Sequence, residues 1–221
     1  MAIAVTPRTV PPAGVDTVDI TIHETYEIDG VGRDTVELKG QLVANRTVPL
    51  LGHGATAVAW ETSTVVAQFT ELNLTGKSPL FGDVNVSLDK SVPSYGVVSN
   101  AKCAAAIGVK VEMPQHGLTL RSSEPIQLQS TVQTVPPIGD ESTQSVKAVD
   151  LLDSRTDKPI GTILQARVMW RDLVQQQVTP VTASVRAARA VGAEDERVRA
   201  LEAENARLKT LLAEAILRAG R

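Results

Sequence analysis

Residues 18–42 read VDITIHETYEIDGVGRDTVELKGQL, and this stretch decides the class of fold. Apolar and polar side chains alternate with a period of two, broken only at Glu24, which is typical of a strand with one buried face. The glycine-containing segment 29–32 predicts a tight turn that returns the chain as a hairpin. The stretch therefore predicts two long antiparallel strands. Their apolar positions are Val18, Ile20, Ile22, Tyr26, Ile28, Val36, Leu38 and Leu42.

The same alternation continues along 57–170, and with the first hairpin it predicts about nine to eleven short strands with turn residues between them. A change of parity between Phe69 and Leu72 predicts a bulge. The last two strands, 146–152 and 160–170, form a hairpin whose second strand turns one face inward. The residues expected on that face are Ile160, Thr162, Leu164, Ala166, Val168 and Trp170. The fold predicted is mainly β, an antiparallel sandwich or barrel.

The chain divides into four segments by composition. Residues 1–14 hold three prolines and a glycine and are expected to form an extended arm. The β domain is expected over 15–174, and a linker over 175–192. Residues 193–219 are rich in Ala, Arg, Glu and Leu, which are strong helix formers. Within the β domain, 101–106 is compatible with either a short helix or a strand of small residues.

Charge and composition exclude several classes of protein. The net charge of −3 is not basic enough to make nucleic acid an expected partner. Cys103 is the single cysteine, so an intrachain disulfide is excluded. No secretory signal and no membrane-spanning apolar run stand out, so we expect a cytoplasmic protein without a membrane partner.

The C-terminal segment carries a heptad pattern. An apolar seam recurs at alternating spacings of three and four residues, and one asparagine interrupts it. A single helix cannot bury such a seam in water, so it needs a partner. The a positions include Val191, Val198, Asn205 and Leu212, and the d positions include Leu201, Leu208 and Ala215.

This segment resembles a leucine zipper, in which an asparagine at an a position fixes register and favours a parallel dimer. Two attractive interhelical pairs fit that geometry, Arg197 with Glu202 and Glu204 with Lys209. The resemblance implies that the chain is its own partner, as a homodimer. Apolar side chains at 211 and 216 broaden the seam and leave a trimer open. The alternative is an amphipathic helix that folds back on its own β domain.

Candidate chemistry is sparse. His23, His53 and His116 lack the local spacing of a metal site. Cys103 lies among alanines, which favours a buried, inert thiol over a nucleophile. No phosphate loop, dinucleotide fingerprint or nucleophile elbow is present, so we expect neither a cofactor nor catalysis.

Two functions follow from these observations. The leading hypothesis is a non-enzymatic structural or binding protein whose β domains, joined by the tail, engage a repeated protein or polymer partner. The alternative is a barrel that binds a small apolar ligand in a cavity lined by aromatic residues. The candidates for that lining are Tyr26, Trp60, Phe69 and Trp170. A third class, an enzyme, would need the histidines or Cys103 to converge in space.

Overall fold

The computed structural model describes residues 13–47, 50–51, 63–99, 102–131 and 142–177. They form thirteen strands in one antiparallel sheet, with a single-turn 3-10 helix, η2 (Pro114–His116). The strands are β1 (Gly14–Ile28), β2 (Gly32–Arg46), β3 (Leu50–Leu51), β4 (Ser63–Ser78), β5 (Gly82–Leu88), β6 (Tyr95–Ser99), β7 (Lys102–Ile107), β8 (Val109–Met113), β9 (Leu118–Ser122), β10 (Ile126–Thr131), β11 (Ser142–Ser145), β12 (Val149–Asp153) and β13 (Pro159–Gln177).

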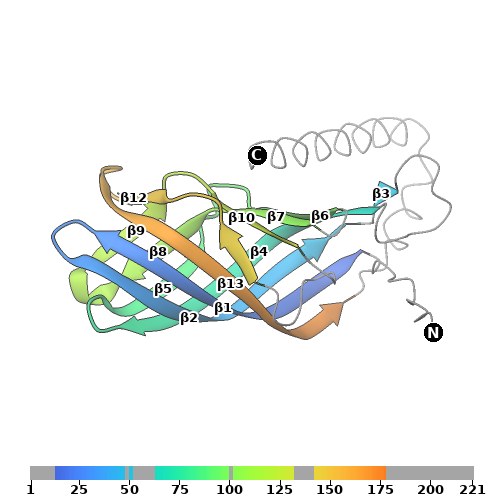
Figure 1. The fold of residues 1–221 in the computed structure, drawn as a ribbon, viewed down its shortest axis with the longest axis horizontal. Helices are drawn as coiled ribbons and strands as arrows, with labels where there is room; N and C mark the ends of the chain where they lie inside the picture. The colour runs from blue at the N-terminus through green and yellow to red at the C-terminus, as the bar shows by residue number, and fades with distance from the viewer. Residues whose placement is uncertain (1–12, 48–49, 52–62, 100–101, 132–141, 178–221) are drawn as a thin grey trace, which may run out of the picture.

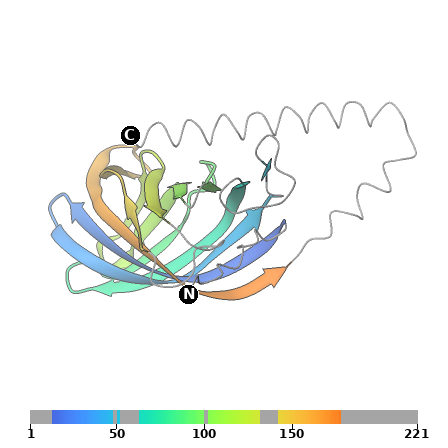
Figure 2. The same cartoon turned by 45° about the vertical axis from the view of Figure 1, so that its right-hand side comes forward.

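The sheet closes on itself twice, which makes it a barrel and not a sandwich. One closed ring runs β1-β2-β4-β5-β8-β9-β12-β13, and β13 pairs back to β1. The second ring uses the same β1, β2, β4 and β13 but is completed by β6, β7, β10 and β11. These four long strands run the length of the barrel and belong to both rings (Figures 1 and 2). Each ring has eight strands. The interior of an eight-stranded barrel is either filled by its own side chains or wide enough for one small ligand.

The remaining four positions around the barrel are split into collinear pairs, β5 with β6, β8 with β7, β9 with β10, and β12 with β11. Serine hydroxyls accept backbone N–H groups where the ladder is interrupted. Ser94 accepts from Gly108 at 3.0 Å, Ser122 from Val109 at 3.1 Å, and Ser145 from Ala166 at 2.9 Å. These hydroxyls satisfy buried donors that the broken ladder would otherwise leave unpaired.

The hairpin predicted around 29–32 is confirmed, with β1 ending at Ile28 and β2 beginning at Gly32. Gly30 and Gly32 both have positive φ there, which L side chains adopt only at a cost. The bulge predicted between Phe69 and Leu72 is also confirmed. Opposite it, Val43 pairs with Glu71 and Ala44 with Phe69, so Thr70 is the extra residue.

The inward face predicted for the last strand is wrong at Thr162 and Leu164, whereas Ile160 packs against the core as expected. A second bulge lies in β13, because Thr25 pairs with Gln165 while Tyr26 pairs with Ile163. The extra residue, Leu164, reverses the parity of the strand. Ile163 is therefore the buried residue before the bulge, where Thr162 and Leu164 were expected; Ala166, Val168 and Trp170 face inward as predicted.

The structure also bears on two expectations about where strands lie. Residues 102–107 are a strand, which settles the choice left open for the alanine segment. Strand β13 continues to Gln177, past the expected end of the β domain at 174. Among the described residues, no helix is long and apolar enough to cross a membrane. The arm at 1–12 and the helix expected at 193–219 lie outside the described residues.

Large side chains fill the ring completed by β5, β8, β9 and β12, which we call the packed half. The ring completed by β6, β7, β10 and β11 is the hollow half. Tyr26 and Phe81 meet edge to face in the packed half, with ring centroids 6.2 Å apart. Nearly all of the fully buried large residues belong to the packed half: Tyr26, Phe81, Ile28, Leu38, Leu74, Met113, Leu120, Leu151, Ile163 and Val36.

Candidate functional site: an apolar cavity with a buried ion pair

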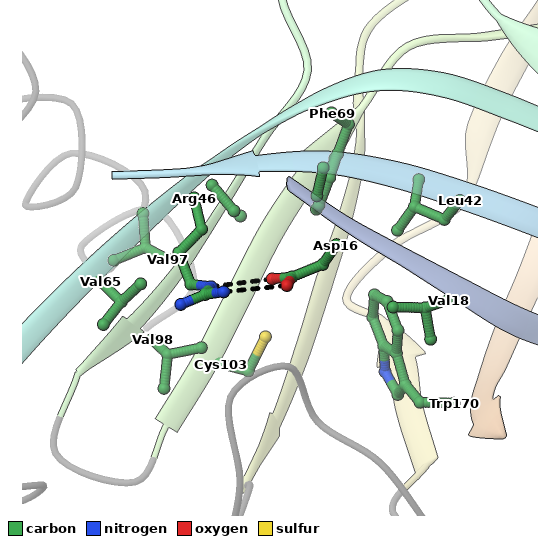
Figure 3. A pocket seen from close by; sticks show the side chains of 13 residues that line it. Asp16, Val18, Leu42, Arg46, Val65, Phe69, Val97, Val98, Cys103 and Trp170 are labelled. Atoms are coloured by element: carbon green, nitrogen blue, oxygen red, sulfur yellow. Dashed lines mark hydrogen bonds and ion pairs between the residues drawn. The ribbon is translucent and has the colours of Figure 1, made fainter. Parts of the chain in front are cut away.

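A cavity of about 470 Å³, counted with the open space at its mouth, lies in the hollow half. The centre of a water-sized molecule can move through about 40 Å³ of it, and its accessible wall is apolar. The enclosed space is therefore small, a few times the minimum that holds one water molecule. The lining residues are Asp16, Val18, Leu42, Ala44, Arg46, Val65, Ala67, Phe69, Gly96, Val97, Val98, Cys103 and Trp170 (Figure 3).

The cavity exists because small residues occupy positions where the packed half has large ones. Ala44, Ala67 and Gly96 contribute little volume to this part of the interior. Gly96 is required by a close approach, since a Cβ there would lie 2.7 Å from the ring of Phe69. The missing side chain lets the Phe69 ring lie against β6 while the space beside it stays empty. Strand pairing holds these walls in place, with Ala67 directly opposite Gly96.

Asp16 and Arg46 form an ion pair in the cavity wall. The Nε of Arg46 donates to Oδ2 of Asp16 at 2.8 Å, and Nη2 donates to Oδ1 at 2.9 Å. The two side chains are 0% and 3% exposed for Arg46 and Asp16. Both oxygens of the carboxylate therefore accept from one guanidinium, the two-pronged geometry that best compensates buried charges. Their strands place them together: Gly14 pairs with Arg46 and Asp16 with Ala44, so the two inward positions are diagonal neighbours.

A hydrogen-bonded chain orients the indole of Trp170 on β13, the strand that pairs with β1. The Nε1 of Trp170 donates to the hydroxyl of Thr143 at 2.9 Å, and Thr143 donates to Ser130 at 3.1 Å. Thr143 is fully buried, and this chain satisfies it. Because the indole N–H is occupied by the protein, Trp170 offers the cavity the rest of its ring as an apolar surface.

A second buried carboxylate lies away from the cavity, in the packed half. The hydroxyl of Tyr26 donates to Oε2 of Glu24. Burial raises the pKa of Glu24 to about 7, although the hydrogen bond from Tyr26 opposes the shift. Burial, with the neighbouring Glu24, also raises the pKa of Tyr26 well above its usual value. Neither residue lines the cavity, so this pair bears on stability and not on the site.

Of the four aromatic residues predicted to line a cavity, Phe69 and Trp170 do so. Tyr26 does not, because it packs against Phe81 in the other half. Trp60 lies outside the described residues. Sequence reasoning missed the ion pair, although both members obey the alternation: Asp16 precedes Val18 by two positions, and Arg46 follows Ala44 by two. Charged residues at inward positions of a strand pattern were the available signal.

The other candidates for chemistry do not come together. His23 faces Glu37 at 3.7 Å on the outer surface, and His116 lies 3.0 Å from the carbonyl oxygen of Leu80. His53 lies outside the described residues. Cys103 is buried as predicted and faces the cavity. In the part of the chain that the structure describes, no three His, Cys, Asp or Glu residues are grouped to hold a metal ion.

The residues predicted for an oligomer interface fall outside the described residues, and the coiled coil stays a prediction. They are Val191, Arg197, Val198, Leu201, Glu202, Glu204, Asn205, Leu208, Lys209, Leu212 and Ala215.

Fold and site together define a class: a closed antiparallel β-barrel with an apolar interior cavity. More specifically, the chain belongs to a family of unknown function, DUF6073, whose model matches residues 1–179. No curated protein matches it. Among solved structures it is similar to DynF from the dynemicin biosynthesis pathway of Micromonospora chersina, with a TM-score of 0.69 and 25% identity. That similarity covers 78% of this chain and 87% of DynF.

Proposed function

We propose that this protein binds a small, largely apolar molecule in the cavity of the hollow half. One observation carries the proposal: the two halves share four strands, yet one holds nearly all of the largest fully buried side chains and the other encloses an apolar space. Protein interiors are close-packed, and cavities in them cost stability. A cavity beside the small side chains of Ala44 and Ala67 is better explained by an occupant than by poor packing.

The structural similarity to DynF is independent support for the same proposal. DynF comes from a pathway that makes the small molecule dynemicin, and its fold is shared over most of both chains. We therefore propose that the ligand is an intermediate or product of small-molecule biosynthesis. Binding without chemical conversion fits the apolar wall, so we keep the expectation of a non-enzymatic protein as part of the proposal.

The test is to look for a molecule in the cavity and then to fill the cavity. Native mass spectrometry of the protein as purified should reveal an apolar adduct that organic extraction removes. After extraction, the uncharged dye N-phenyl-1-naphthylamine should bind with a rise in fluorescence. Ala67→Leu, which places a larger side chain in the wall, should abolish both signals. Ala148→Leu is the matched control, because Ala148 is exposed at the split between β11 and β12.

The outcomes separate cleanly. Loss of adduct and dye binding in Ala67→Leu but not in Ala148→Leu supports a ligand in this cavity. Absence of both signals from the wild-type protein, or their persistence in Ala67→Leu, overturns the proposal. Circular dichroism of each variant establishes that the β fold is retained.

A second candidate function rests on the heptad pattern of residues 193–219. We propose it only as an addition to ligand binding, with the tail joining copies of the barrel. Light scattering of the full chain and of a version ending at Gln177 tests it. A full chain that is a dimer or trimer, and becomes a monomer on truncation, supports oligomerisation by the tail. The same number of chains per particle in both proteins overturns it.

A further inference from the structure

We infer that Phe69 sets the length of ligand that the cavity accepts, and that Gly96 holds the Phe69 ring out of the space that the ligand fills. This inference rests on the proposed function and names the residues that determine specificity at the same site. A short hydrocarbon chain would fit between the end of the barrel and the Phe69 ring, and a longer chain would meet the ring.

Successive inward positions on β4 show which end of the cavity Phe69 occupies. From the start of β4 into the barrel, Val65, Ala67 and Phe69 line the cavity in turn (Figure 3). Strand pairing places Val98 opposite Val65 and Gly96 opposite Ala67. Phe69 belongs to the main hydrophobic core, whereas Val65 and Val98 do not. The ring of Phe69 therefore stands at the inner end of the cavity, between the empty space and the core.

The backbone around Phe69 is held in place, so the size of its side chain decides how far it reaches into the interior. Its N–H donates to the carbonyl oxygen of Ser94 at 3.0 Å. In the bulge that follows, the hydroxyl of Thr70 donates to the carbonyl oxygen of Val43 at 3.3 Å. Beyond the bulge the next inward residue, Leu72, is buried in the core. A shorter side chain at position 69 should therefore leave extra space at the inner end of the cavity.

Gly96 provides the niche in which the tip of the ring lies. A Cβ at position 96 would lie 2.7 Å from the Cζ atom of Phe69 and 3.3 Å from its Cε1 atom. The tip of the ring thus occupies volume that an L side chain at position 96 would need for its own Cβ. Because both residues line the cavity, a ring displaced from this niche has the empty space beside it to move into. A methyl group at position 96 should therefore make the cavity smaller.

Two substitutions should change the size limit in opposite directions. Phe69→Leu removes the tip of the ring and should let the cavity take a longer chain. Gly96→Ala should displace the ring toward the cavity and weaken the binding of every chain that reaches it. In Phe69→Leu/Gly96→Ala, the side chain at 69 lacks the atoms that approach position 96, so the double variant should regain the binding that Gly96→Ala loses.

The experiment is a titration of the extracted full-length protein with straight-chain alcohols from 1-propanol to 1-octanol, followed by the NMR shifts of the Ala67 and Val98 amides. In the wild-type protein, affinity should rise about fourfold with each methylene buried, and stop rising where the chain meets Phe69. In Phe69→Leu the rise should continue for at least one further methylene. The first alcohol beyond the wild-type limit should therefore bind this variant about fourfold more tightly.

The other variants complete the comparison. Gly96→Ala should lower the affinity for the longest alcohol that the wild-type protein accommodates by about fourfold or more. Phe81→Leu is the matched control, because Phe81 is fully buried in the packed half and does not line the cavity. It should leave the length limit unchanged. Circular dichroism of each variant establishes that the β fold is retained. If Phe69→Leu does not fold, Phe69→Val, which also lacks the ring, takes its place with the same expectation.

The results distinguish this inference from the proposed function. If wild-type affinity keeps rising through 1-octanol, if Phe69→Leu leaves the limit unchanged, or if Phe81→Leu moves it equally, the inference fails and ligand binding stands. If Gly96→Ala binds as the wild-type protein does, or if the double variant does not regain binding, the role assigned to Gly96 is overturned. If no alcohol binds, the inference fails; an apolar adduct in the purified protein would then still support ligand binding, and the absence of that adduct would overturn the proposed function too.

Discussion

The packed and hollow halves of the barrel are built on the same four long strands and differ in the side chains that these strands turn inward. In the packed half, Tyr26, Phe81 and large aliphatic residues are fully buried in the interior. In the hollow half, the small residues Ala44, Ala67 and Gly96 line a cavity. Each half also buries a carboxylate: Asp16 in the hollow half is paired with Arg46, whereas Glu24 in the packed half has the hydroxyl of Tyr26.

The difference teaches how a β-barrel keeps an interior space without losing its fold. Backbone pairing closes both rings, so the hollow half does not need a filled core to hold its strands together. Stability from burial can then be concentrated in the packed half, while the other half stays open to a ligand. Four predictions test this division.

Arg46→Met should have the largest effect. It leaves Asp16 buried without its partner, and breaking a buried pair from one side costs about 3–5 kcal/mol. Urea unfolding measures the loss. Arg33→Met, at the exposed hairpin tip, is the control and should cost little. The double variant Asp16→Leu/Arg46→Met should recover most of the stability, and if it is as unstable as the single variant, the ion pair is required for the fold itself.

Glu24 should make the stability depend on pH. Its pKa is about 7 in the folded protein against an ordinary value of 4.5, so the folded state holds a proton that the unfolded state releases between these values. Stability should therefore fall as pH rises from about 4.5 through 7, by on the order of 3 kcal/mol in all. Urea unfolding at pH 5 and pH 8 checks the slope, and Glu24→Gln should remove most of it. A wild-type protein equally stable at both pH values would contradict the shift.

A matched pair of valine truncations compares the two halves directly. Val36→Ala removes two methyl groups from solid packing and should cost about 2 kcal/mol. Val65→Ala removes the same groups from the cavity wall, where they have fewer contacts to lose, and should cost about 1 kcal/mol. Thermal or urea unfolding of the two variants gives the comparison. Equal losses would mean that the hollow half is as tightly packed as the other.

The smallest effect is expected at Thr143. Replacing it with valine keeps the shape but leaves the indole N–H of Trp170 without its acceptor, at a cost of about 1 kcal/mol. The tryptophan emission should change, since the ring loses the bond that fixes it. Thr162→Val is the control, because its hydroxyl bonds Asp150 on the exposed surface. An unchanged spectrum would show that packing alone orients the indole.

The strand class, the first hairpin and the bulge at Thr70 could be predicted from the sequence, because each has a local cause: alternation, turn glycines, or a change of parity. The bulge at Leu164 could not, since the apolar residues on both sides of it fit either parity. It became visible only through the pairing of β13 with β1. Closure into a barrel depends on pairing between strands that are distant in sequence, and no local pattern reports it.

The candidate site was half predictable. Phe69 and Trp170 could be named because aromatic residues on inward faces line whatever space a barrel encloses. The ion pair was missed because Asp16 and Arg46 are 30 residues apart, and each looks like an ordinary surface charge until the register of β1 and β2 is known. The cavity lies where small side chains on several neighbouring strands face the same part of the interior. The sequence of one strand alone does not show this.

The pairing of β1 with β13 also bears on how the protein is made. Val15 pairs with Gln177, so the seam of the barrel joins segments from the two ends of the described chain. During synthesis, the edge of β1 that pairs with β13 stays unpaired until β13 has left the ribosome. Such long-range closure is slow and leaves an aggregation-prone edge exposed in the meantime. The polar outward positions of β1, among them Asp19, His23 and Glu27, suit a strand that must stay soluble while it waits.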